Sequence, residues 1–455
     1  MPASLLAGQR VLVVGLARSG VAAARVALAG GARVTVTDRR AATELGAQID
    51  QLGTTVEFAL GGHDPADFTG ADLVVVSPGV PLALAEIQEA RRQGVPVLAE
   101  VELAARLLPA LPIVGISGTN GKSTTTALAG ALLGRDRRVF TGGNLGTPLC
   151  ELVLSGEEVD AAVVELSSFQ LEGIDRLRPR VGAVLNVTPD HLDRYRDVTE
   201  YALAKARLFM NQQPGDVAIA NARDPLSLAL AASSRARLVT FGFGDAGPRS
   251  ARAAESGGEF SLSVGQGAPE RYLVRSRALR GRHNLENAMA AALCARLMGV
   301  PGGQVQAGID AFAGLPHRLQ LVGERSGVEW VNDSKATNVD STLVGLAAFP
   351  AGHRHVVLIL GGRGKRAPYA PLRPLFDRVK ALVTIGEDAP SIERELGDLA
   401  PTERAGTLAA AVQRSAELAA PGDVVLLSPA CASYDQFKSY EHRGDSFRRL
   451  VGELG

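Results

Sequence analysis

The stretch Gly118-Thr-Asn-Gly-Lys-Ser123 decides how this chain is interpreted. It follows a short apolar run, 113–116, and opens a segment, 124–133, whose composition is typical of a helix. A glycine-rich turn between a strand and a helix directs backbone N–H groups and the positive helix end toward phosphate groups. Lys122 can reach the outer phosphates of a nucleotide, and the Ser123 hydroxyl can ligate magnesium. The stretch therefore predicts an ATP-binding turn, with an ordinary strand-to-helix turn as the alternative.

The match to the general phosphate-loop motif is approximate. The motif places a glycine five positions before Gly121, where this chain has Ile116, and Gly115 lies one residue away. The order of strand, turn and helix is nevertheless the context that the motif requires.

The composition is that of a multidomain globular protein. A chain of 455 residues is too long for a single core. Lys+Arg and Asp+Glu both number 48, which does not favour a nucleic-acid or membrane partner. No apolar run approaches the roughly 20 residues that cross a bilayer, and the first ten residues lack the features of a signal peptide. The scattered Cys150, Cys294 and Cys431 fit neither a disulfide framework nor a zinc site, so we expect a reducing, cytoplasmic setting.

Lysine is scarce in this chain. Only six of the 48 basic residues are lysine, and four of these lie in the motifs described here: Lys122, Lys205, Lys335 and Lys365. A lysine amine can lose its proton and be modified, which an arginine side chain cannot do. The retained lysines are therefore candidates for chemistry that arginine cannot supply, with chance as the alternative for any one of them.

Residues 1 to about 100 alternate between strand and helix patterns. The runs 10–15 and 33–38 are typical of buried strands and flank an alanine-rich helix, 19–29, which indicates the opening βαβ unit of a nucleotide-binding fold. The turn between them lacks the G-x-G-x-x-G spacing of a dinucleotide site. Asp38 can hold a sugar hydroxyl or be a solubilising charge at a strand end. A further strand, 73–76, runs into the turn Ser77-Pro78-Gly79, at the edge where such sheets bind ligands.

Two more α/β units are expected to follow. Two prolines in 107–112 mark the approach to a second domain, which carries strands at 161–165 and 181–187 and a helix at 284–298. The region 242–269, rich in glycine, serine and arginine, predicts an exposed excursion. A third unit begins near 314–318 and carries strand patterns at 355–360, 381–385 and 424–427. We expect three α/β domains in series, 1–100, 101–314 and 315–455, with mainly parallel sheets covered by helices.

Polar residues follow two strands of the second domain. Glu165 comes directly after an apolar strand, where a magnesium-binding acid belongs, although a helix cap or a solvated strand end is the alternative. Asp190, His191 and Asp193 follow another strand, and the histidine can be a metal ligand, a general base or a plain loop residue. Lys205 lies in the apolar run 201–210, and periodicity alone predicts a lysine that snorkels to water.

Further polar residues lie toward the C-terminus. Asn284 and Asn287 are three residues apart at a helix start, so they can read an adenine edge or cap the helix. Three polar loops, 332–338, 361–365 and 428–433, follow strands of one sheet and predict a surface for an anionic ligand. Cys431 has no basic or histidine neighbour in sequence, so we expect it to be buried packing.

The motifs of this chain resemble those of the Mur ligase family over almost its whole length. The phosphate turn and the DHLDRY stretch are shared with the folate relatives of that family, whereas DSKATN and SPACAS resemble its D-glutamate-adding members. The stretches that carry the resemblance are GTNGKS at 118–123, GGNLG at 142–146, ELSSFQLE at 165–172, NVTPDHLDRY at 186–195, LPHR at 315–318, NDSKATN at 332–338, LSPACAS at 427–433 and DQF at 435–437.

The resemblance implies a fold and a reaction. The fold is α/β, with a Rossmann-like N-terminal domain for a UDP-sugar, a central P-loop ATPase-type domain and a Rossmann-like C-terminal domain for an amino acid. The reaction is the ATP-dependent addition of D-glutamate to UDP-N-acetylmuramoyl-L-alanine through an acyl phosphate, in peptidoglycan precursor synthesis. We expect a cytoplasmic monomer whose partners are these small molecules, with no nucleic acid and no membrane.

The resemblance also implies roles for individual residues. Catalysis falls to Lys122, Glu165, His191 and Lys205, and two magnesium ions to Ser123, Glu165, His191 and Lys205. ATP contacts fall to Gly118, Thr119, Asn120, Gly121, Lys122, Ser123, Thr124, Asn144, Asn284, Asn287, Arg318 and Asp333. UDP-sugar contacts fall to Arg18, Ser19, Asp38, Arg39, Arg40 and Gly79, with Arg39 in place of an expected threonine. D-glutamate contacts fall to Thr337, Lys365, Ser433 and Tyr440, with Tyr440 in place of an expected phenylalanine.

For Lys205 the resemblance implies a carbamate. Carbon dioxide on the neutral amine turns a cation into a magnesium-binding anion, which reverses the snorkelling interpretation and agrees with the scarcity of lysine.

Three other functions compete with a D-glutamate ligase. An NAD-dependent oxidoreductase, built on the N-terminal βαβ unit, leaves the phosphate turn and the DSKATN cluster unexplained. An ATP-regulated binding protein would need Lys122 but neither Glu165 nor Lys205. A folylpolyglutamate synthase-like ligase performs the same reaction on another acceptor, and the UDP-type N-terminal domain argues against it.

Overall fold

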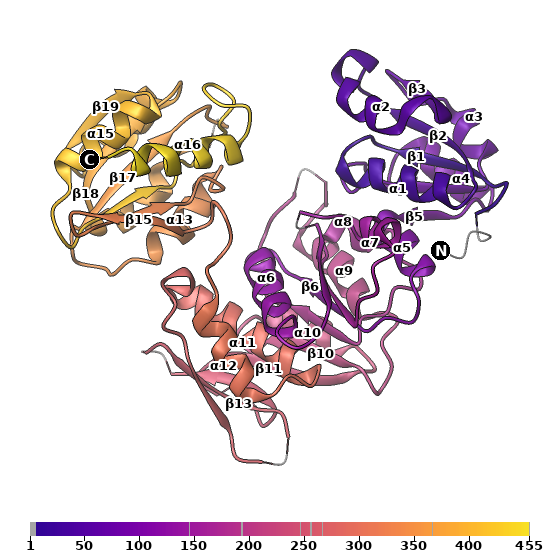
Figure 1. The fold of residues 1–455 in the computed structure, drawn as a ribbon, viewed down its shortest axis with the longest axis horizontal. Helices are drawn as coiled ribbons and strands as arrows, with labels where there is room; N and C mark the ends of the chain where they lie inside the picture. Colours follow the sequence, from indigo (N-terminus) through magenta and orange to yellow (C-terminus); the bar gives the residue numbers. More distant parts are fainter. Residues whose placement is uncertain are drawn as a thin grey trace. The chain divides into compact units, whose positions relative to one another are not determined.

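The computed structural model describes residues 6–144, 146–192, 194–245, 247–254, 257–265, 267–365 and 367–454, so the predicted Asp193 lies outside the described residues. The chain forms two compact units, one made of Met1–Leu273 with Glu286–Ile309 and the other of Val274–Leu285 with Asp310–Gly455. The first unit contains two sheets and the second contains one (Figure 1).

The first unit opens with a parallel sheet of order β3-β2-β1-β4-β5. Alternate residues of β1 enter two cores: Val11 and Val13 pack on the side of α1 and α5, whereas Leu12 and Val14 pack on the side of α3 and α4. Successive side chains of a strand point to opposite faces, so a strand covered on both sides is apolar throughout. The predicted βαβ unit is confirmed. The strands are β1 Arg10–Val14, β2 Arg33–Asp38, β3 Glu57–Leu60, β4 Leu73–Val76 and β5 Val97–Ala99, and the helices are α1 Arg18–Ala29, α2 Gly46–Leu52, α3 Pro65–Gly70, α4 Ala85–Arg92 and α5 Glu100–Leu107.

The strand order of this first sheet creates a ligand crevice. Because β2 and β4 flank β1 on opposite sides, the loops that follow β1 and β4 diverge at the carboxyl edge. Gly20 keeps these loops close: a Cβ at this position would lie 1.9 Å from the Gly15 carbonyl oxygen and 2.8 Å from Ser77 Oγ.

The second sheet of the first unit has the order β14-β13-β12-β11-β10-β9-β6-β8-β7. Strands β6 to β12 run parallel, and β13 and β14 continue the sheet as antiparallel neighbours. The strands are β6 Ile113–Ser117, β7 Val139–Gly143, β8 Ala161–Glu165, β9 Val181–Val184, β10 Val217–Asn221, β11 Arg237–Phe243, β12 Ser250–Ala253, β13 Glu259–Ser263 and β14 Glu270–Leu273. The helices are α6 Lys122–Leu133, α7 Leu149–Ser155, α8 Ser168–Glu172, α9 Val198–Ala206, α10 Pro225–Ala232, α11 Arg282–Leu297 and α12 Gly302–Ala311.

The prediction of an exposed excursion at 242–269 is wrong. Strands β12 and β13 form there, and Ala251, Phe260 and Leu262 are buried. Glycine and serine dominate the composition of the turns, but the apolar residues of β13 alternate with polar ones, which is the pattern of a half-buried strand.

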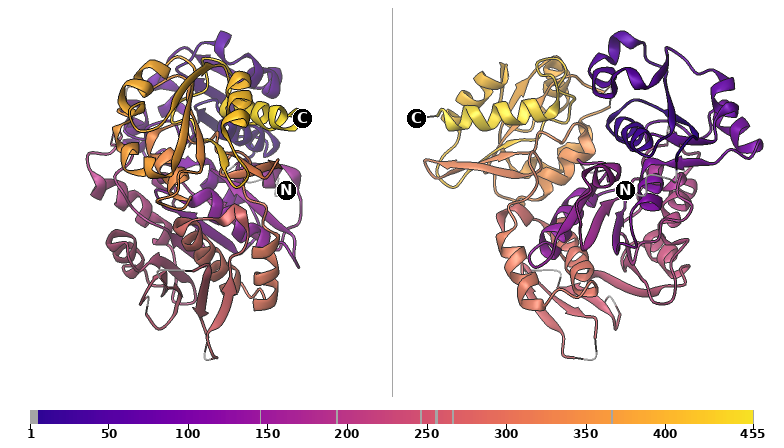
Figure 2. Two further views of the ribbon diagram at one scale, coloured as in Figure 1. Left: turned by 90° about the vertical axis from the view of Figure 1, so that its left-hand side faces the viewer. Right: turned by 45° about the vertical axis from the view of Figure 1, so that its right-hand side comes forward.

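The second unit contains a six-stranded sheet of order β15-β16-β20-β17-β18-β19, in which β15 is antiparallel and the other strands are parallel. Figure 2 shows most of this unit in orange to yellow. Its strands again divide alternate residues between two cores, as Leu358 and Ile359 of β17 do. The strands are β15 Gln320–Arg325, β16 Val328–Asn332, β17 Val356–Gly361, β18 Val379–Ile385, β19 Thr402–Gly406 and β20 Val424–Leu427, and the helices are α13 Val339–Ala347, α14 Ala389–Leu396, α15 Leu408–Leu418 and α16 Tyr440–Gly452.

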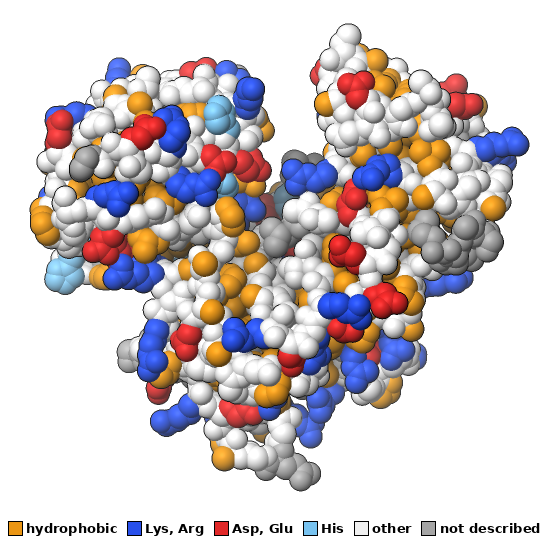
Figure 3. Space-filling view, viewed as in Figure 1, with side chains coloured by type: hydrophobic (Ala, Val, Ile, Leu, Met, Phe, Trp, Pro, Cys, Tyr) orange, Lys and Arg blue, Asp and Glu red, His pale blue; other side chains and the backbone are white. Residues whose placement is uncertain are grey.

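The surface carries both signs of charge. Figure 3 shows basic and acidic side chains interspersed on the face in view. Within the described part of the chain, no helix combines the length and the apolar character needed to cross a membrane.

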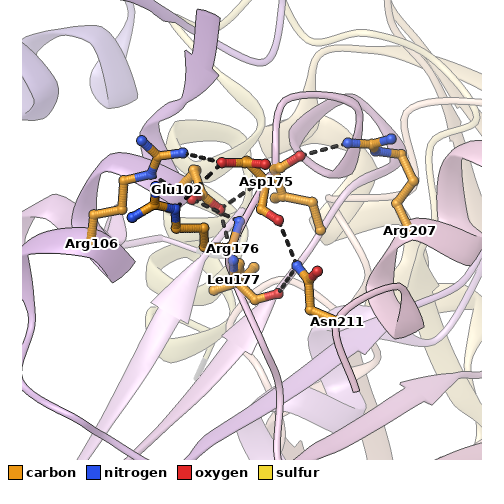
Figure 4. Close-up of polar contacts among 8 residues, drawn as sticks. Glu102, Arg106, Asp175, Arg176, Leu177, Arg207 and Asn211 are labelled. Atoms are coloured by element: carbon orange, nitrogen blue, oxygen red, sulfur yellow. Dashed lines mark hydrogen bonds and ion pairs between the residues drawn. The ribbon is translucent and has the colours of Figure 1, made fainter. Parts of the chain in front are cut away.

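A buried carboxylate ties the two sheets of the first unit together. Glu102 of α5 is fully buried and accepts hydrogen bonds from the backbone N–H groups of Asp175, Arg176 and Leu177 at 2.9–3.0 Å (Figure 4). Arg106 Nε donates to the same carboxylate at 2.7 Å. The segment that follows α8 is therefore held on the helix that leaves the first sheet.

We predict that Glu102→Ala destabilises the first unit strongly. The substitution leaves three backbone donors without their acceptor and should cost about 3 kcal/mol of unfolding free energy or more. Urea denaturation followed by circular dichroism measures the loss. Glu89→Ala, which removes one partner of the exposed Arg92–Glu89 pair, is the control and should change stability by less than about 1 kcal/mol. Equal midpoints for the two variants would contradict the role of Glu102.

Candidate functional site

The phosphate turn lies between β6 and α6, as predicted, and the helix begins at Lys122, two residues before the expected start. Gly118 and Gly121 have φ values of 149° and 85°, a region that favours glycine. A Cβ at Gly121 would lie 2.3 Å from Asn287 Oδ1. Asn287 of α11 therefore packs directly on the turn, where its Oδ1 also accepts a hydrogen bond from Thr125 at 3.2 Å.

Two lysines share one backbone carbonyl of this turn. Lys122 Nζ donates to Gly118 O at 2.9 Å and to Thr119 O at 2.8 Å, and Lys205 Nζ donates to Gly118 O at 2.8 Å. Lys205 comes from α9 and is only 1% exposed. Burial and the charge of Lys122 lower the pKa of Lys205 well below its ordinary value. The snorkelling interpretation of Lys205 is wrong, because its amine is buried against the turn.

Glu165 supplies a negative charge beside these lysines. It ends β8, is 2% exposed and accepts a hydrogen bond at Oε1 from Asn144 Nδ2 at 2.7 Å. Its buried Oε2 has no hydrogen-bond partner among the described residues. The solvated-end alternative is therefore wrong. A buried carboxylate oxygen without a donor is a group that a cation satisfies.

His191 lies in the same neighbourhood through a chain of aromatic contacts. Its ring centroid is 6.0 Å from that of Tyr201, and the Tyr201 ring lies 4.4 Å from Lys205 Nζ. The backbone of His191 has a φ of 54°, and its N–H donates to Asp190 Oδ1 at 2.9 Å. The described residues contain no group of three His, Cys, Asp or Glu side chains arranged to hold a metal. A metal at this turn would therefore need other oxygens, such as the Ser123 hydroxyl or those of a nucleotide.

A cavity of about 500 Å³ lies at the crevice of the first sheet. It gathers every residue to which the resemblance assigned a UDP-sugar contact, together with others that it did not include, among them His63 and Ser77. The lining includes Arg18, Ser19, Asp38, Arg39, Arg40, His63, Ser77 and Gly79.

Asp38 holds the loops after β1 and β2, which line this cavity, through hydrogen bonds to Leu16 and Arg40. One oxygen accepts the Leu16 N–H at 2.7 Å, and the carboxylate also accepts bonds from the Arg40 guanidinium and the Arg40 N–H. Burial opposes the effect, but these hydrogen bonds lower the pKa of Asp38 to about 2. The alternative of a solubilising charge is wrong, because Asp38 is 6% exposed and bonded on both oxygens.

Arg194 connects this cavity to the second sheet. Its guanidinium donates to Pro78 O at 3.2 Å and Val80 O at 3.4 Å, and it pairs with Glu172 at 2.7 Å. It also stacks 4.0 Å above the Phe169 ring. The 186–195 segment therefore holds the 77–80 turn of the cavity from outside.

In the second unit Asp333 is buried, and the half-buried Arg318 is near enough for its charge to act on that carboxyl. Asp333 Oδ2 accepts from Ser428 Oγ at 2.8 Å and Oδ1 from the Leu319 N–H at 3.2 Å, and burial raises the pKa of Asp333 to about 6. The buried Arg318 Nε has no hydrogen-bond partner among the described residues. Asn284 Nδ2 donates to Arg280 O at 3.0 Å. These groups suit a polar ligand that brings its own acceptors.

The residues assigned to D-glutamate lie on the polar loops of the second unit and on the start of α16. Ser433 is buried, Thr337 and Tyr440 are half-buried, and Lys365 is exposed. A pair of backbone hydrogen bonds between Arg363 and Ala432, at 2.9 and 3.0 Å, joins the loops 361–365 and 428–433. The prediction for Cys431 is confirmed, because it is fully buried with Tyr369 Oη at 3.0 Å.

Comparison with known proteins identifies the family. Three family models match the chain: Mur ligase MurD-like N-terminal domain at residues 9–99, Mur ligase middle domain at 116–295 and Mur ligase glutamate ligase domain at 317–431. The chain is 71% identical to the UDP-N-acetylmuramoylalanine–D-glutamate ligase of Anaeromyxobacter dehalogenans, over 100% of this chain and 99% of that protein.

The chain belongs to the Mur ligase family. It is also 54% identical to the protein of the same name from Myxococcus xanthus, over 99% of each chain. Among solved structures, the UDP-N-acetylmuramate–alanine ligase MurC of Thermotoga maritima has the same fold, with a TM-score of 0.61 at 20% identity over 98% of this chain and 99% of that chain.

The C-terminal unit of this Mur ligase contains a buried arginine that sequence reasoning missed. Arg443 of α16 is 1% exposed and donates to Ser334 Oγ, Ser334 O and the carbonyl oxygens of Cys431 and Ala432 at 2.9–3.4 Å. A Cβ on Gly362 would lie 3.2 Å from Arg443 Nη1. One guanidinium therefore bonds to two of the three polar loops and lies close to Gly362 of the third. Its sequence context, a helix with exposed arginines, carries no signal of burial.

We predict that Asp333 makes the second unit less stable as the pH rises from about 4 to 6. The folded state holds the Asp333 proton up to a pKa of about 6, whereas the unfolded chain releases it near 3.8, so unfolding becomes easier through that range. The difference in unfolding free energy between Asp333→Asn and the parent chain should shift by up to about 3 kcal/mol between pH 4 and pH 7, in favour of the variant at pH 7.

The buried Trp330 of β16 is the single tryptophan of the chain, so its fluorescence during urea denaturation reports on this unit. Asp445→Asn, at a largely exposed position, is the control and should show no such shift. Parallel pH profiles for Asp333→Asn and the parent would contradict the buried, protonated Asp333.

Proposed function

We propose that this protein joins D-glutamate to UDP-N-acetylmuramoyl-L-alanine with the hydrolysis of ATP, in the synthesis of a peptidoglycan precursor. The observation that carries the proposal is the meeting of Lys122, Lys205 and Glu165 at the Gly118 turn. The same compact unit holds the cavity lined by the residues assigned to the UDP-sugar.

The chemistry proceeds through an acyl phosphate. An oxygen of the acceptor carboxylate attacks the γ-phosphorus of ATP, and the bond to ADP breaks. The amine of D-glutamate then adds to the acyl carbon and loses a proton, and phosphate leaves from the tetrahedral intermediate. The first step brings two anions together, and at ~4 Å their repulsion is about 4 kcal/mol at an effective dielectric constant near 20. The positive charge of Lys122 at the turn offsets that repulsion.

Magnesium fits the oxygens at this turn. Glu165 Oε2 is buried and has no donor among the described residues, and Ser123 is the second residue of α6, directly after the phosphate turn. Ser123 and Glu165 would hold one ion, and His191 and Lys205 a second. Bound magnesium would neutralise phosphate charge and orient the reacting groups.

Lys205 can hold a metal only after its charge is reversed. The neutral amine adds to carbon dioxide to form a carbamate, with release of one proton. Burial and Lys122 lower the pKa of Lys205, so more of its amine is neutral at physiological pH than for an exposed lysine.

The three domains would divide the work at 1–100, 101–314 and 315–455. The first binds the UDP-sugar, the second binds ATP at residues 118–124 with Asn144 and Asn287, and the third adds Arg318 and Asp333. Asn284 is also assigned a contact with ATP. The D-glutamate contacts fall to Thr337, Lys365, Ser433 and Tyr440. We place the protein in the cytoplasm, as a monomer with small-molecule partners.

Phosphate release from ATP tests the proposed function directly. Purified protein with magnesium, ATP and UDP-N-acetylmuramoyl-L-alanine should release phosphate at a steady rate only when D-glutamate is added. L-glutamate in its place is the control for the second substrate. A rate of phosphate release that does not depend on the UDP-sugar, or does not depend on D-glutamate, would contradict the proposal.

We predict that Lys205→Arg abolishes the reaction while the fold survives. Arginine keeps the positive charge and most of the volume but cannot form a carbamate. Lys380→Arg is the matched control, because Lys380 forms an ion pair with Asp423 in the second unit and arginine can keep it. Circular dichroism verifies folding, and turnover is measured by phosphate release. Turnover of Lys205→Arg near that of the parent would discard the carbamate.

We predict that Arg443→Lys raises the KM for D-glutamate about tenfold or more, with a smaller effect on the KM for ATP. A single ammonium group cannot reproduce the planar fork that reaches two loops at once. Arg448→Lys, on the exposed side of the same helix, is the control. Equal increases in both KM values would show that Arg443 supports only the general stability of the unit.

A further inference from the structure

Glu172, the last residue of α8, holds two neighbouring residues of the 186–195 segment. Its Oε1 accepts a hydrogen bond from Tyr195 Oη at 2.5 Å, and its Oε2 accepts one from Arg194 Nη2 at 2.7 Å. The side chains of Glu172 and Arg194 are 19% and 13% exposed, and Tyr195 is buried. Removing one partner from an ion pair that is largely withdrawn from water leaves the other charge uncompensated. The carboxylate is therefore a firm anchor for both residues, although the resemblance assigns it no role.

The anchored residues lie at the far end of a turn that begins at His191. The carbonyl oxygen of His191 accepts hydrogen bonds from the backbone N–H groups of Arg194 and Tyr195, at 2.9 and 3.0 Å. His191 has a φ of 54°, a left-handed conformation that residues other than glycine adopt at an energetic cost. Such a conformation persists only where surrounding contacts hold it. The two bonds to Glu172 are contacts of this kind.

The ring of Phe169, also in α8, contacts the same group of residues. The Arg194 guanidinium lies 4.0 Å from the ring centroid, and the His191 ring centroid lies 4.7 Å from it, with an interplanar angle of 58°. The Tyr195 ring is stacked on Phe169 at 6.0 Å. Helix α8 therefore holds the backbone turn through one residue and packs against the imidazole through another.

Arg194 extends the same anchor to the cavity of the first sheet. Its guanidinium donates to the carbonyl oxygens of Pro78 and Val80, and both of these residues line that cavity. One planar group thus serves the carboxylate and two carbonyls at once, so its orientation depends on Glu172. Without the carboxylate the guanidinium is free to turn, and the cavity wall loses its support.

We propose that Glu172 is a positioning residue of the ligase reaction: it holds the His191 turn through Tyr195 and the wall of the UDP-sugar cavity through Arg194. The inference rests on the proposed function, which assigns His191 to catalysis and the acceptor to the cavity. Because a misplacement of about 1 Å can lower a rate about 100-fold, the Tyr195 arm acts on kcat. The Arg194 arm acts on binding of the acceptor.

Two variants separate the arms. Tyr195→Phe removes a single hydroxyl, so kcat should fall about tenfold while the KM for the UDP-sugar stays within a factor of about two. Glu172→Gln also loses the charge that pairs with Arg194, so it should lower kcat as much and raise the KM for the UDP-sugar about fivefold. Glu151→Gln, whose carboxylate pairs with Arg25 at 3.1 Å in the same unit, is the matched control and should change neither constant.

A double variant tests whether Tyr195 and Glu172 act through one contact. Glu172→Gln with Tyr195→Phe should lower kcat no further than Glu172→Gln alone, whereas residues that act independently multiply their effects. Calorimetric titration with UDP-N-acetylmuramoyl-L-alanine measures acceptor affinity without turnover and should weaken in Glu172→Gln but not in Tyr195→Phe. Circular dichroism verifies that each variant is folded.

Three results would overturn the positioning role and leave the proposed function standing. They are an unchanged kcat in Tyr195→Phe, multiplied losses in the double variant, and equal increases of KM for ATP, D-glutamate and the UDP-sugar in Glu172→Gln. The first of these decides the matter even if Glu172→Gln fails to fold. A parent protein without D-glutamate-dependent turnover would contradict the proposed function, and the positioning role with it.

Discussion

Two lysine amines meet at one backbone oxygen, Gly118 O, and the candidate site of the first unit depends on that contact. Like charges at this distance oppose each other, and burial of Lys205 adds to the cost. The negative charges of Glu165 and Asp190 partly offset the positive charge. Both raise the pKa of Lys205, whereas burial and Lys122 lower it. A site with unbalanced positive charge is stabilised most by anionic ligands, which is what a ligase that brings two anions together requires.

The order of strands in the second sheet brings these groups together. β6 lies between β8 and β9, all three parallel, so their carboxyl ends meet at one edge. The phosphate turn follows β6, Glu165 ends β8, and the segment with Asp190 follows β9. Lys205 arrives from α9, and the ring of Tyr201 in that helix lies beside its amine. Lys205 thus bonds to the carbonyl of a residue that lies 87 positions earlier in the chain.

The sequence predicts features that are encoded in a local pattern of residues and misses those that depend on contacts between distant segments. Buried strands with continuous apolar runs, such as 73–76 and 424–427, are predicted to the residue, because both faces of each strand are covered. Periodicity misplaces Lys205, because the groups that make its burial tolerable come from distant segments. The strands at 250–263 escape notice because glycine and serine in their turns outweigh two short alternating runs. Arg443 and His63 acquire their surroundings only through tertiary contacts, so no local pattern marks them.

The contacts of Arg194 affect which lengths of acceptor the site can accommodate. The Arg194 guanidinium donates to the Pro78 and Val80 carbonyls and is also paired with Glu172. The cavity of the first sheet and the phosphate turn therefore belong to one compact unit that these contacts hold together. We expect these contacts to fix the distance between the cavity of the first sheet and the phosphate turn. A fixed distance would select acceptors by length. An acceptor whose sugar–peptide arm is too short cannot bring its carboxylate to the γ-phosphate, and one whose arm is too long cannot align its carboxylate with it.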